Sequence, residues 1–318
     1  MKVALLACLA VLLAAPGSRA METAMPEVPE AARKLAMEGH ELVHSGKYEP
    51  ALLKFRAAWA GGSRSPLVAY NAGCAAARLG KADEAFEWLR QVVQSGWDDV
   101  AYLQKDEDLA SIRADPRFAT VVAGMKEAAA KAEAAVADKP LRDELVRRVD
   151  EHSQAWKALV DDGFRTEALK KKAETIAERN VAWFKTVLDK HGFPGRKLVG
   201  EKGAQAAFFL VLHAENERAL QKKCLGLLEK SVKIGDASPR FLAYLTDRIR
   251  VAEGRQQVYG TQFMKAANGA QVPHPIEDAA NVDERRSALG LPPLAVYTRM
   301  LREAGKSEPV KSEHAEKR

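Results

Sequence analysis

The stretch from Ala206 to Leu212, in the second half of the chain, is hydrophobic at every position. A helix without a polar face has neighbours on all sides, so this one is expected at the centre of a domain. Beyond Glu215 the hydrophobic positions narrow to one stripe at helical spacing, formed by Leu220, Cys224, Leu227 and Leu228. The preceding segment, 191–203, is punctuated by Gly192, Pro194, Gly195, Gly200 and Gly203. These patterns predict a glycine-rich loop that leads into a central helix over residues 204–228.

Helical periodicity also dominates the flanking segments of the second half. The spacing of hydrophobic residues predicts helices over 141–160, 166–190 and 239–251. A last helix is expected from Asp283, with an interruption at Gly290 and at the two prolines that follow.

The helical period is lost between residues 257 and 276. Two short segments there, 257–264 and 270–276, flank the dipeptide Asn268-Gly269. Asn-Gly between two such segments is typical of a tight turn between antiparallel strands. The sequence therefore predicts one small β-hairpin in an otherwise helical half.

The first half repeats itself with a period of 34 residues, which relates Gly39 to Gly73, Gly46 to Gly80, Ala51 to Ala85, Phe55 to Leu89 and Ala58 to Val92. Each unit has the pattern helix, short glycine turn, helix, with small residues where the two helices cross. This pattern resembles the tetratricopeptide repeat, a helical hairpin of the same length. The second unit has Ala82 where that family usually has an aromatic residue.

The resemblance implies a domain organisation. Because such stacks need about three units, two repeats and a degenerate terminal unit (95–118) are expected to form an array over 31–121. The segment 122–139, rich in Ala, Glu and Lys, is expected to be a helical spacer. A second domain follows over 140–301, and the charged tail, 302–318, is expected to be disordered. The predicted fold class is mostly α: a short tetratricopeptide-like array of helical hairpins, followed by a helical domain with a small β-hairpin.

The same resemblance implies a groove for a protein or peptide partner. In that family the first helix of each unit faces the concave side, and the matching residues here are Arg33, His40, His44, Tyr70, Asn71 and Arg78. Guanidinium groups pair well with carboxylates, so an acidic or C-terminal peptide is the expected ligand. The alternative is a solvated polar face without a partner.

The N-terminus has the three parts of a secretory signal peptide. Lys2 supplies the positive charge, residues 3–15 are apolar, and Ser18-Arg19-Ala20 offers small residues for cleavage. We therefore expect residues 1–20 to be removed and the protein to be exported, to the periplasm or the exterior of a bacterium. No stretch reaches the roughly 18 apolar residues that a membrane span requires, so none is predicted.

Charge and cysteine content argue against a nucleic-acid-binding protein and against a fold held together by disulfides. The formal net charge is +6, which falls to +4 (6 − 2) when Lys2 and Arg19 are removed. Lys and Arg residues do not cluster with aromatic residues, so no nucleic-acid partner is expected. Cys74 and Cys224 would remain in the exported chain. Both occupy hydrophobic helical positions, which favours two buried side chains over a disulfide between them.

Six segments of the second half resemble, in order, those of an uncharacterised bacterial domain family of unknown function. They are HGFPG (191–195), VLHAE (211–215), AYLTDR (243–248), QVYGTQF (257–263), PIED (275–278) and DERRSALGL (283–291). The resemblance covers about residues 140–300. It implies no activity, because none is established for the family.

The polar residues of these segments allow one catalytic hypothesis. His191, His213 and Asp247 would be catalytic residues of an enzyme, for example a hydrolase of envelope material. The alternatives are structural: His213 extends a hydrophobic stripe, His191 can cap the preceding helix, and Asp247-Arg248 can pin its helix to the hairpin. The sequence has no spacing typical of metal ligands and no motif for a cofactor.

Three hypotheses about function follow. The leading one is an exported bacterial envelope protein whose repeats bind a peptide or protein and whose second domain has a binding or structural role. The second treats that domain as the enzyme described above. The third is an assembly subunit in which both halves make protein contacts. The sequence does not predict the oligomeric state.

Overall fold

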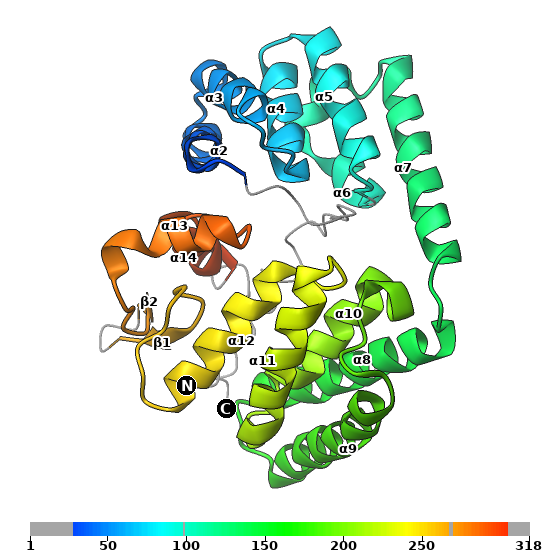
Figure 1. Ribbon diagram of the computed structural model, residues 1–318, viewed down its shortest axis with the longest axis vertical. Helices are drawn as coiled ribbons and strands as arrows, with labels where there is room; N and C mark the ends of the chain where they lie inside the picture. Colours follow the sequence, from blue (N-terminus) through cyan, green and yellow to red (C-terminus); the bar gives the residue numbers. More distant parts are fainter. Residues whose placement is uncertain (1–27, 98, 267–269, 305–318) are drawn as a thin grey trace, which may run out of the picture.

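The computed structural model describes residues 28–97, 99–266 and 270–304 (Figure 1). Helices make up most of these ranges, and the only sheet within them has two antiparallel strands. The predicted fold class, mostly α with a small β-hairpin, is therefore confirmed. The predicted signal peptide and most of the predicted tail lie outside the described residues.

Four helices form the first two helical hairpins: α2 (Glu30–His44), α3 (Tyr48–Ala60), α4 (Pro66–Arg78) and α5 (Ala82–Gln94). The 34-residue period reappears in the hydrogen bonds of their turns. The N–H groups of Gly46 and Lys47 donate to Val43 and Leu42, and those of Gly80 and Lys81 donate to the equivalent Ala77 and Ala76. Both glycines have a φ near +70°, the left-handed conformation that glycine adopts most easily.

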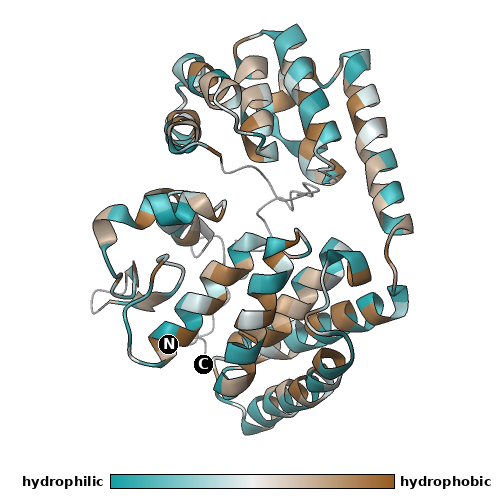
Figure 2. Ribbon diagram, viewed as in Figure 1, coloured by the Kyte–Doolittle hydropathy of each residue, from teal (hydrophilic) through white to brown (hydrophobic). Residues whose placement is uncertain are grey.

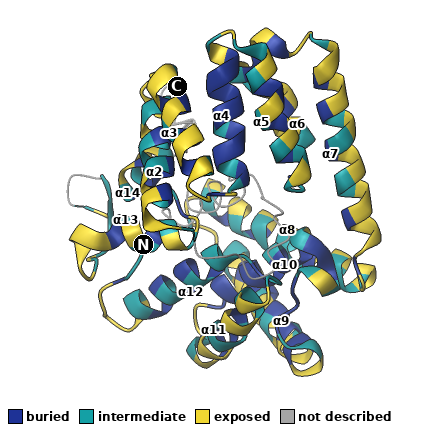
Figure 3. Cartoon of the chain, turned by 45° about the horizontal axis from the view of Figure 1, so that its top comes forward, coloured by how far each residue is buried: buried dark blue, intermediate teal, exposed yellow. Residues whose placement is uncertain are grey.

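Small and large residues alternate where the hairpins cross. A β-carbon on Gly39 would lie 2.6 Å from the ring of Phe55, and one on Gly73 would lie 3.4 Å from Leu89. Phe55 and Leu89 are both completely buried. Helix α4 lies at the centre of the array and is buried along almost its whole length (Figure 3).

A third unit continues the array in the same register. Helix α6 (Val100–Lys105) and the 3₁₀ helix η1 (Glu107–Ile112) lie 34 residues after α4, and α7 (Pro116–Ala134) lies 34 residues after the start of α5. The hydroxyl of Ser111 donates to the carbonyl of Ala77, its equivalent position one unit earlier. Because α7 runs without a break from this unit to Ala134, the predicted boundary between 121 and 122 falls inside a helix.

The second half begins with three long helices, α8 (Lys139–Asp161), α9 (Glu167–His191) and α10 (Arg196–Leu212), followed by α11 (Arg218–Lys233) and α12 (Pro239–Ala252). The predicted helix over 204–228 is wrong. The chain leaves the helix at His213 and turns through Glu217 before α11 begins. Helix α10 also starts earlier than predicted, at Arg196, and contains a kink at Gly200, whose φ is 70°.

The apolar segment of α10 is buried as predicted. From Ala206 to Leu212 no residue is more than 7% exposed. Phe208 stacks on Phe241 of α12, with 4.2 Å between ring centroids, and α10 also contacts α8, α9 and α11. Helix α10 is therefore the central helix of the second hydrophobic core.

The last elements lie against α12. Strands β1 (Phe263–Lys265) and β2 (Gln271–Pro273) pair in the register Met264 to Val272. A short 3₁₀ helix η2 (Ala279–Asn281), α13 (Val282–Ala288) and α14 (Leu294–Ala304) follow. The predicted Asn268-Gly269 turn lies outside the described residues.

The described residues form two large hydrophobic cores and one small cluster. The first core is formed by α2–α7, between Ala36 and Met125, and the second by residues between Leu145 and Leu301. The small cluster lies between α8 and α9, from Ala155 to Ile176. Most helices carry both hydrophobic and hydrophilic residues, so each has an apolar side to bury (Figure 2). The two halves are joined by α7, by a contact between α2 and α13, and by two backbone hydrogen bonds from Ala137 and Asp138 to the start of α10.

Candidate functional site

The carboxylate of Asp247, on α12, holds the loop formed by residues 257–262. It accepts hydrogen bonds from the backbone N–H groups of Val258 (2.7 Å), Tyr259 (3.1 Å) and Thr261 (2.9 Å), and from the hydroxyl of Thr261 (2.9 Å). Asp247 is completely buried. Burial raises its pKa, and the four donors counter that rise because they favour the ionised form.

Two more buried side chains complete the support of this loop. The amide of Gln257 donates to the carbonyls of Gln262 (3.0 Å) and His274 (2.8 Å) and accepts from the N–H of Gln262 (2.9 Å). Arg286, on α13, donates to the carbonyls of Tyr259 (2.6 Å) and Pro292 (2.7 Å). Asp247 thus binds the loop's N–H groups, and Arg286 binds a carbonyl of the same loop.

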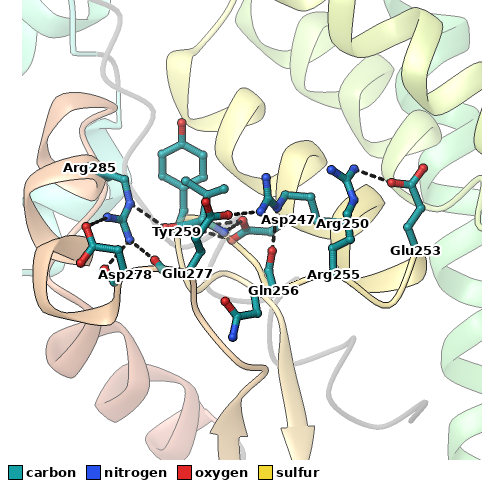
Figure 4. A network of polar contacts seen from close by, with 10 residues as sticks. Asp247, Arg250, Glu253, Arg255, Gln256, Tyr259, Glu277, Asp278 and Arg285 are labelled. Carbon is teal, nitrogen blue, oxygen red and sulfur yellow. Dashed lines mark hydrogen bonds and ion pairs between the residues drawn. The ribbon is translucent and has the colours of Figure 1, made fainter.

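Arginines on either side connect the loop to its neighbours (Figure 4). Arg285 donates to the carbonyls of Val258 (3.0 Å), Glu277 (2.7 Å) and Asp278 (2.9 Å). Arg250 donates to the carbonyl of Gln256 at 2.6 Å and pairs with the carboxylate of Glu277. Tyr259 extends away from this network, and its hydroxyl has no hydrogen-bond partner among the described residues (Figure 4).

Five of the six segments that the sequence analysis singled out meet in this region. AYLTDR contributes Asp247, and DERRSALGL contributes the two arginines of α13. QVYGTQF forms the loop, and PIED pairs with its first residue, Gln257, through backbone hydrogen bonds. VLHAE joins through Glu215, which pairs with Arg248 at 3.1 Å. The sixth segment, HGFPG, forms the separate turn between α9 and α10.

Arg248 follows Asp247 on α12, and the charge of its guanidinium acts on two of three neighbouring histidines, His213 and His274. The ring centroid of His213, at the end of α10, is 4.5 Å from that of Phe209 and 5.3 Å from that of His152 on α8. The Nε2 atom of His213 is buried and has no hydrogen-bond partner in the described part of the chain. His274 follows β2, and its N–H donates to the carbonyl of Gln262.

These imidazoles are uncharged at neutral pH. Burial, together with the positive charge of Arg248, lowers the pKa of His213 well below its usual value and also lowers that of His274. Burial lowers the pKa of His152, against a smaller opposing effect of Glu215. The group therefore contains one guanidinium, one carboxylate and three neutral rings.

The proposed catalytic residues His191, His213 and Asp247 lie on three different elements: at the end of α9, at the end of α10 and within α12. No hydrogen bond, ion pair or ring contact joins any two of them within the described ranges. His191 lies in the last turn of α9. Asp247 is an anchor whose two oxygens are both occupied by donors, so it does pin α12 to the hairpin segment, but without Arg248 as its partner.

The six predicted groove residues differ in how accessible their side chains are. Tyr70 is only 2% exposed, because the rings of Trp97 (4.4 Å) and Tyr102 (5.6 Å) of the third unit cover it. The amide nitrogen of Asn71 lies 2.6 Å from Nδ1 of His40, so these two side chains bind each other across α2 and α4.

The remaining three are more accessible. Arg33 is half-buried and donates to the carbonyl of Val28. His44 is exposed. Arg78 is exposed, lies over the ring of Tyr48 and is 3.7 Å from Asp108.

One further cluster lies between α4 and η1. The ligand atoms of Cys74, Asp106 and Asp108 are within 4.8 Å of one another, a spacing at which three groups can hold a metal ion. The oxygens of Asp106 already accept hydrogen bonds from the hydroxyl of Tyr70 (2.5 Å) and the N–H of Asp108 (2.9 Å). Burial raises the pKa of the Cys74 thiol, so it is protonated at neutral pH.

Sequence reasoning missed His152, Gln257 and His274. His152 lies on a charged helix outside the six segments, so only folding brings it to His213. Gln257 is the first residue of QVYGTQF and His274 directly precedes PIED, but their roles depend on the hairpin register. A usable signal was the concentration of polar residues in QVYGTQ, in a half that is otherwise helical.

The fold and this site define a class of protein: a helical-hairpin array followed by a helical domain built around one pinned loop. The chain belongs to the family of unknown function DUF6624, whose family model matches residues 140–308. Residues 59–133 are similar to the N-terminal domain of A/B hydrolase-like proteins. Comparisons with the curated proteins and with the solved structures found no match. Of the helices that the structure describes, none has the length and hydrophobicity that a bilayer span requires.

Proposed function

We propose that this chain is an exported bacterial envelope protein that binds ligands through both halves. The helical array would bind a protein or peptide partner, and the family domain would hold a ligand beside the loop 257–262. The observation that carries the second part is the fixation of this loop. Asp247, Gln257 and Arg286, all completely buried, bind its backbone, and the buried hydroxyl of Thr261 donates to Asp247.

If this loop were only a connection, its buried polar groups would lower the stability of the fold without a benefit. Buried polar and charged groups destabilise a fold unless each is hydrogen-bonded, whereas a simple turn needs none of them. The fixed backbone holds Tyr259 and Gln262 in one orientation, and the N–H of His274 donates to the carbonyl of Gln262. A preorganised polar surface is what specific binding requires.

The loop is tested with Tyr259→Phe. The hydroxyl has no partner among the described residues, so its removal should leave the melting temperature unchanged. Compounds that stabilise the wild-type chain in a thermal-shift screen should stabilise this variant less. If every stabilising compound acts equally on both proteins, the loop does not form the ligand site.

The array is tested by crosslinking to envelope extracts. Arg33→Ala and Arg78→Ala remove the two cations of the predicted peptide face, and Arg90→Ala on α5 serves as the exposed control. Recovery of an acidic partner should fall with the first two variants and not with the third. Equal recovery from all three argues against the groove.

Export is tested independently. N-terminal sequencing of the protein from fractionated cells should begin at Met21, after removal of residues 1–20. A chain that retains Met1 and stays in the cytoplasmic fraction contradicts this part of the proposal.

A second candidate function is the hydrolase that would use His191, His213 and Asp247. The neutral His213 ring, whose Nε2 has no hydrogen-bond partner among the described residues, suits a general base. The similarity of 59–133 to an A/B hydrolase-like N-terminal domain agrees with it only broadly. Loss of a measured hydrolytic activity in His213→Gln, with an unchanged melting temperature, would favour this function over simple binding.

A further inference from the structure

Arg248 and Glu215 form an ion pair whose two members have very different surroundings. The side chain of Arg248 is 14% exposed, whereas that of Glu215 is 54% exposed, and 3.1 Å separates them. Glu215 lies in the turn between α10 and α11, so it can leave the pair without disturbing a helix. Arg248 lies in the middle of α12 and cannot follow it.

Two imidazole rings lie near this guanidinium. His213 lies close enough to Arg248 for its pKa to be lowered by that charge, and so does His274. His152 contacts His213 at 5.3 Å between centroids. Within the described ranges the buried Nε2 of His213 has no hydrogen-bond partner, and a buried polar atom of this kind usually meets water or a ligand.

We propose that this group of residues binds a small carboxylate ligand, which replaces the Glu215 carboxylate on Arg248 and forms a hydrogen bond with His213. The proposal rests on the proposed function, in which the family domain holds a ligand, and it names the chemical class of that ligand. Glu215 acts as an internal substitute for the ligand. In the bound state it turns outward into water, where it is already half exposed.

The charge balance favours a carboxylate over a phosphate. Arg248 already binds one carboxylate, and a guanidinium matches the two oxygens of such a group. A phosphate dianion would bring a second negative charge, and the neighbouring rings are neutral. A metal cation is disfavoured because the positive charge of Arg248 would repel it.

Binding should be coupled to protonation. The group is faced by His152 from α8, His213 and Glu215 from the end of α10, Arg248 from α12 and His274 from the hairpin. A ligand carboxylate next to His213 favours the charged ring and so raises its lowered pKa. The complex therefore takes up protons, and affinity should increase as the pH falls from 7.5 to 6.

The test is a histidine-ring NMR titration of the full exported chain with acetate. Acetamide serves as the neutral probe of the same shape, and inorganic phosphate as the competing anion. We expect acetate to shift the His213 and His152 signals saturably, and to leave that of His44, in the other half, unchanged. The acetate concentration at half saturation should be several-fold lower at pH 6 than at pH 7.5.

Variants separate the roles of the two charges. Glu215→Gln removes the internal competitor and should lower the half-saturating concentration about tenfold. Asp189→Asn is the matched control, because it removes the exposed carboxylate of another ion pair in the same domain, 2.9 Å from Lys223. Arg248→Gln should abolish the titration, and Arg248→Lys, which keeps the charge, should retain part of it.

Three results would overturn the inference. The first is a shift of the rings by phosphate without one by acetate, and the second is an equal effect of acetate and acetamide. The third is the lack of any effect of acetate on Glu215→Gln, which would leave a buried water as the partner of His213. The failure of the wider proposal is distinct from these. Compounds that stabilise the wild type but not Tyr259→Phe would preserve a ligand site even if no carboxylate binds.

Discussion

A β-carbon on Gly195 would lie 2.1 Å from a carboxylate oxygen of Asp236, closer than any two such atoms can approach. The reason lies in the start of α10. The N–H groups of Arg196 and Lys197 donate to the carbonyl and carboxylate of Asp236, both at 2.7 Å. Asp236 thereby caps a helix from outside it, and only glycine leaves room for the cap. This contact gives the HGFPG segment a structural role.

The first prediction concerns this contact. Gly195→Ala should lower the free energy of unfolding of the second domain by about 1–3 kcal/mol, because the added methyl group must displace Asp236. Gly226→Ala is the matched control: it lies within α11 and has nothing within 4 Å of the added carbon. Since alanine favours helix, that variant should gain about 0.5–1 kcal/mol. Denaturant titrations measure both; equal effects of the two variants would contradict the assignment.

At the scale of elements, α2 and α4 are connected by a polar contact inside an apolar interface. The amide of Asn71 donates to Nδ1 of His40, because an amide nitrogen cannot accept. The edge of the His40 ring also packs on Phe55, at 5.2 Å between centroids. Burial, with a smaller effect of His44, lowers the pKa of His40 to about 4. The contact between the first two units therefore requires a neutral ring.

The second prediction follows from this pKa. The pKa of His40 in the unfolded chain is near 6.5, so the unfolded state binds more protons between pH 6.5 and 4. The stability that His40 contributes is complete above pH 6.5 and declines as the pH falls towards 4. His40→Gln should flatten this part of the stability profile of the array. His44→Gln, at an exposed position of the same helix, should follow the wild type; a similar flattening in both variants would refute the prediction.

At the scale of the whole molecule, the two cores share no helix. Phe55 lies in the centre of the first core and Phe208 in the centre of the second, and both are at most 1% exposed. The connections between the halves are α7, the contact of α2 with α13 and a few backbone hydrogen bonds. Each half therefore has its own core, and we expect each to fold and unfold as a separate unit.

The third prediction tests this independence. Phe55→Ala and Phe208→Ala should each lower the stability of its own half by about 3–5 kcal/mol, through lost burial and the cavity left behind. Hydrogen exchange followed by mass spectrometry should show reduced protection in α2–α7 for the first variant and in α8–α14 for the second. If either variant lowers protection in both halves by the same amount, the contacts between the halves couple them into one folding unit.

Much of the fold could be predicted because its signals are local. Helical periodicity indicated α8, α9 and α12, and the 34-residue repeat indicated the hairpins α2–α3 and α4–α5. The hydrophobic segment of α10 indicated its central position. Residues 213–217 were harder, since the hydrophobic pattern resumes beyond them with the same period and the break is made by five polar or small residues without Pro or Gly.

The sequence by itself determined the helical class, the repeat register and the burial of α10, because these depend on spacing along one chain. Only the tertiary structure decided which polar residues meet. Asp247 and Arg286 are 39 positions apart and His152 and His213 are 61 apart, as their numbers in the sequence give. A local sequence pattern cannot predict contacts between residues so far apart in the chain. The pairings arise because α8, α10 and α12 pack side by side and bring the loop 257–262 against α12. The same packing buried Tyr70 and removed it from the predicted groove, since the surface of a helix is decided by its neighbours.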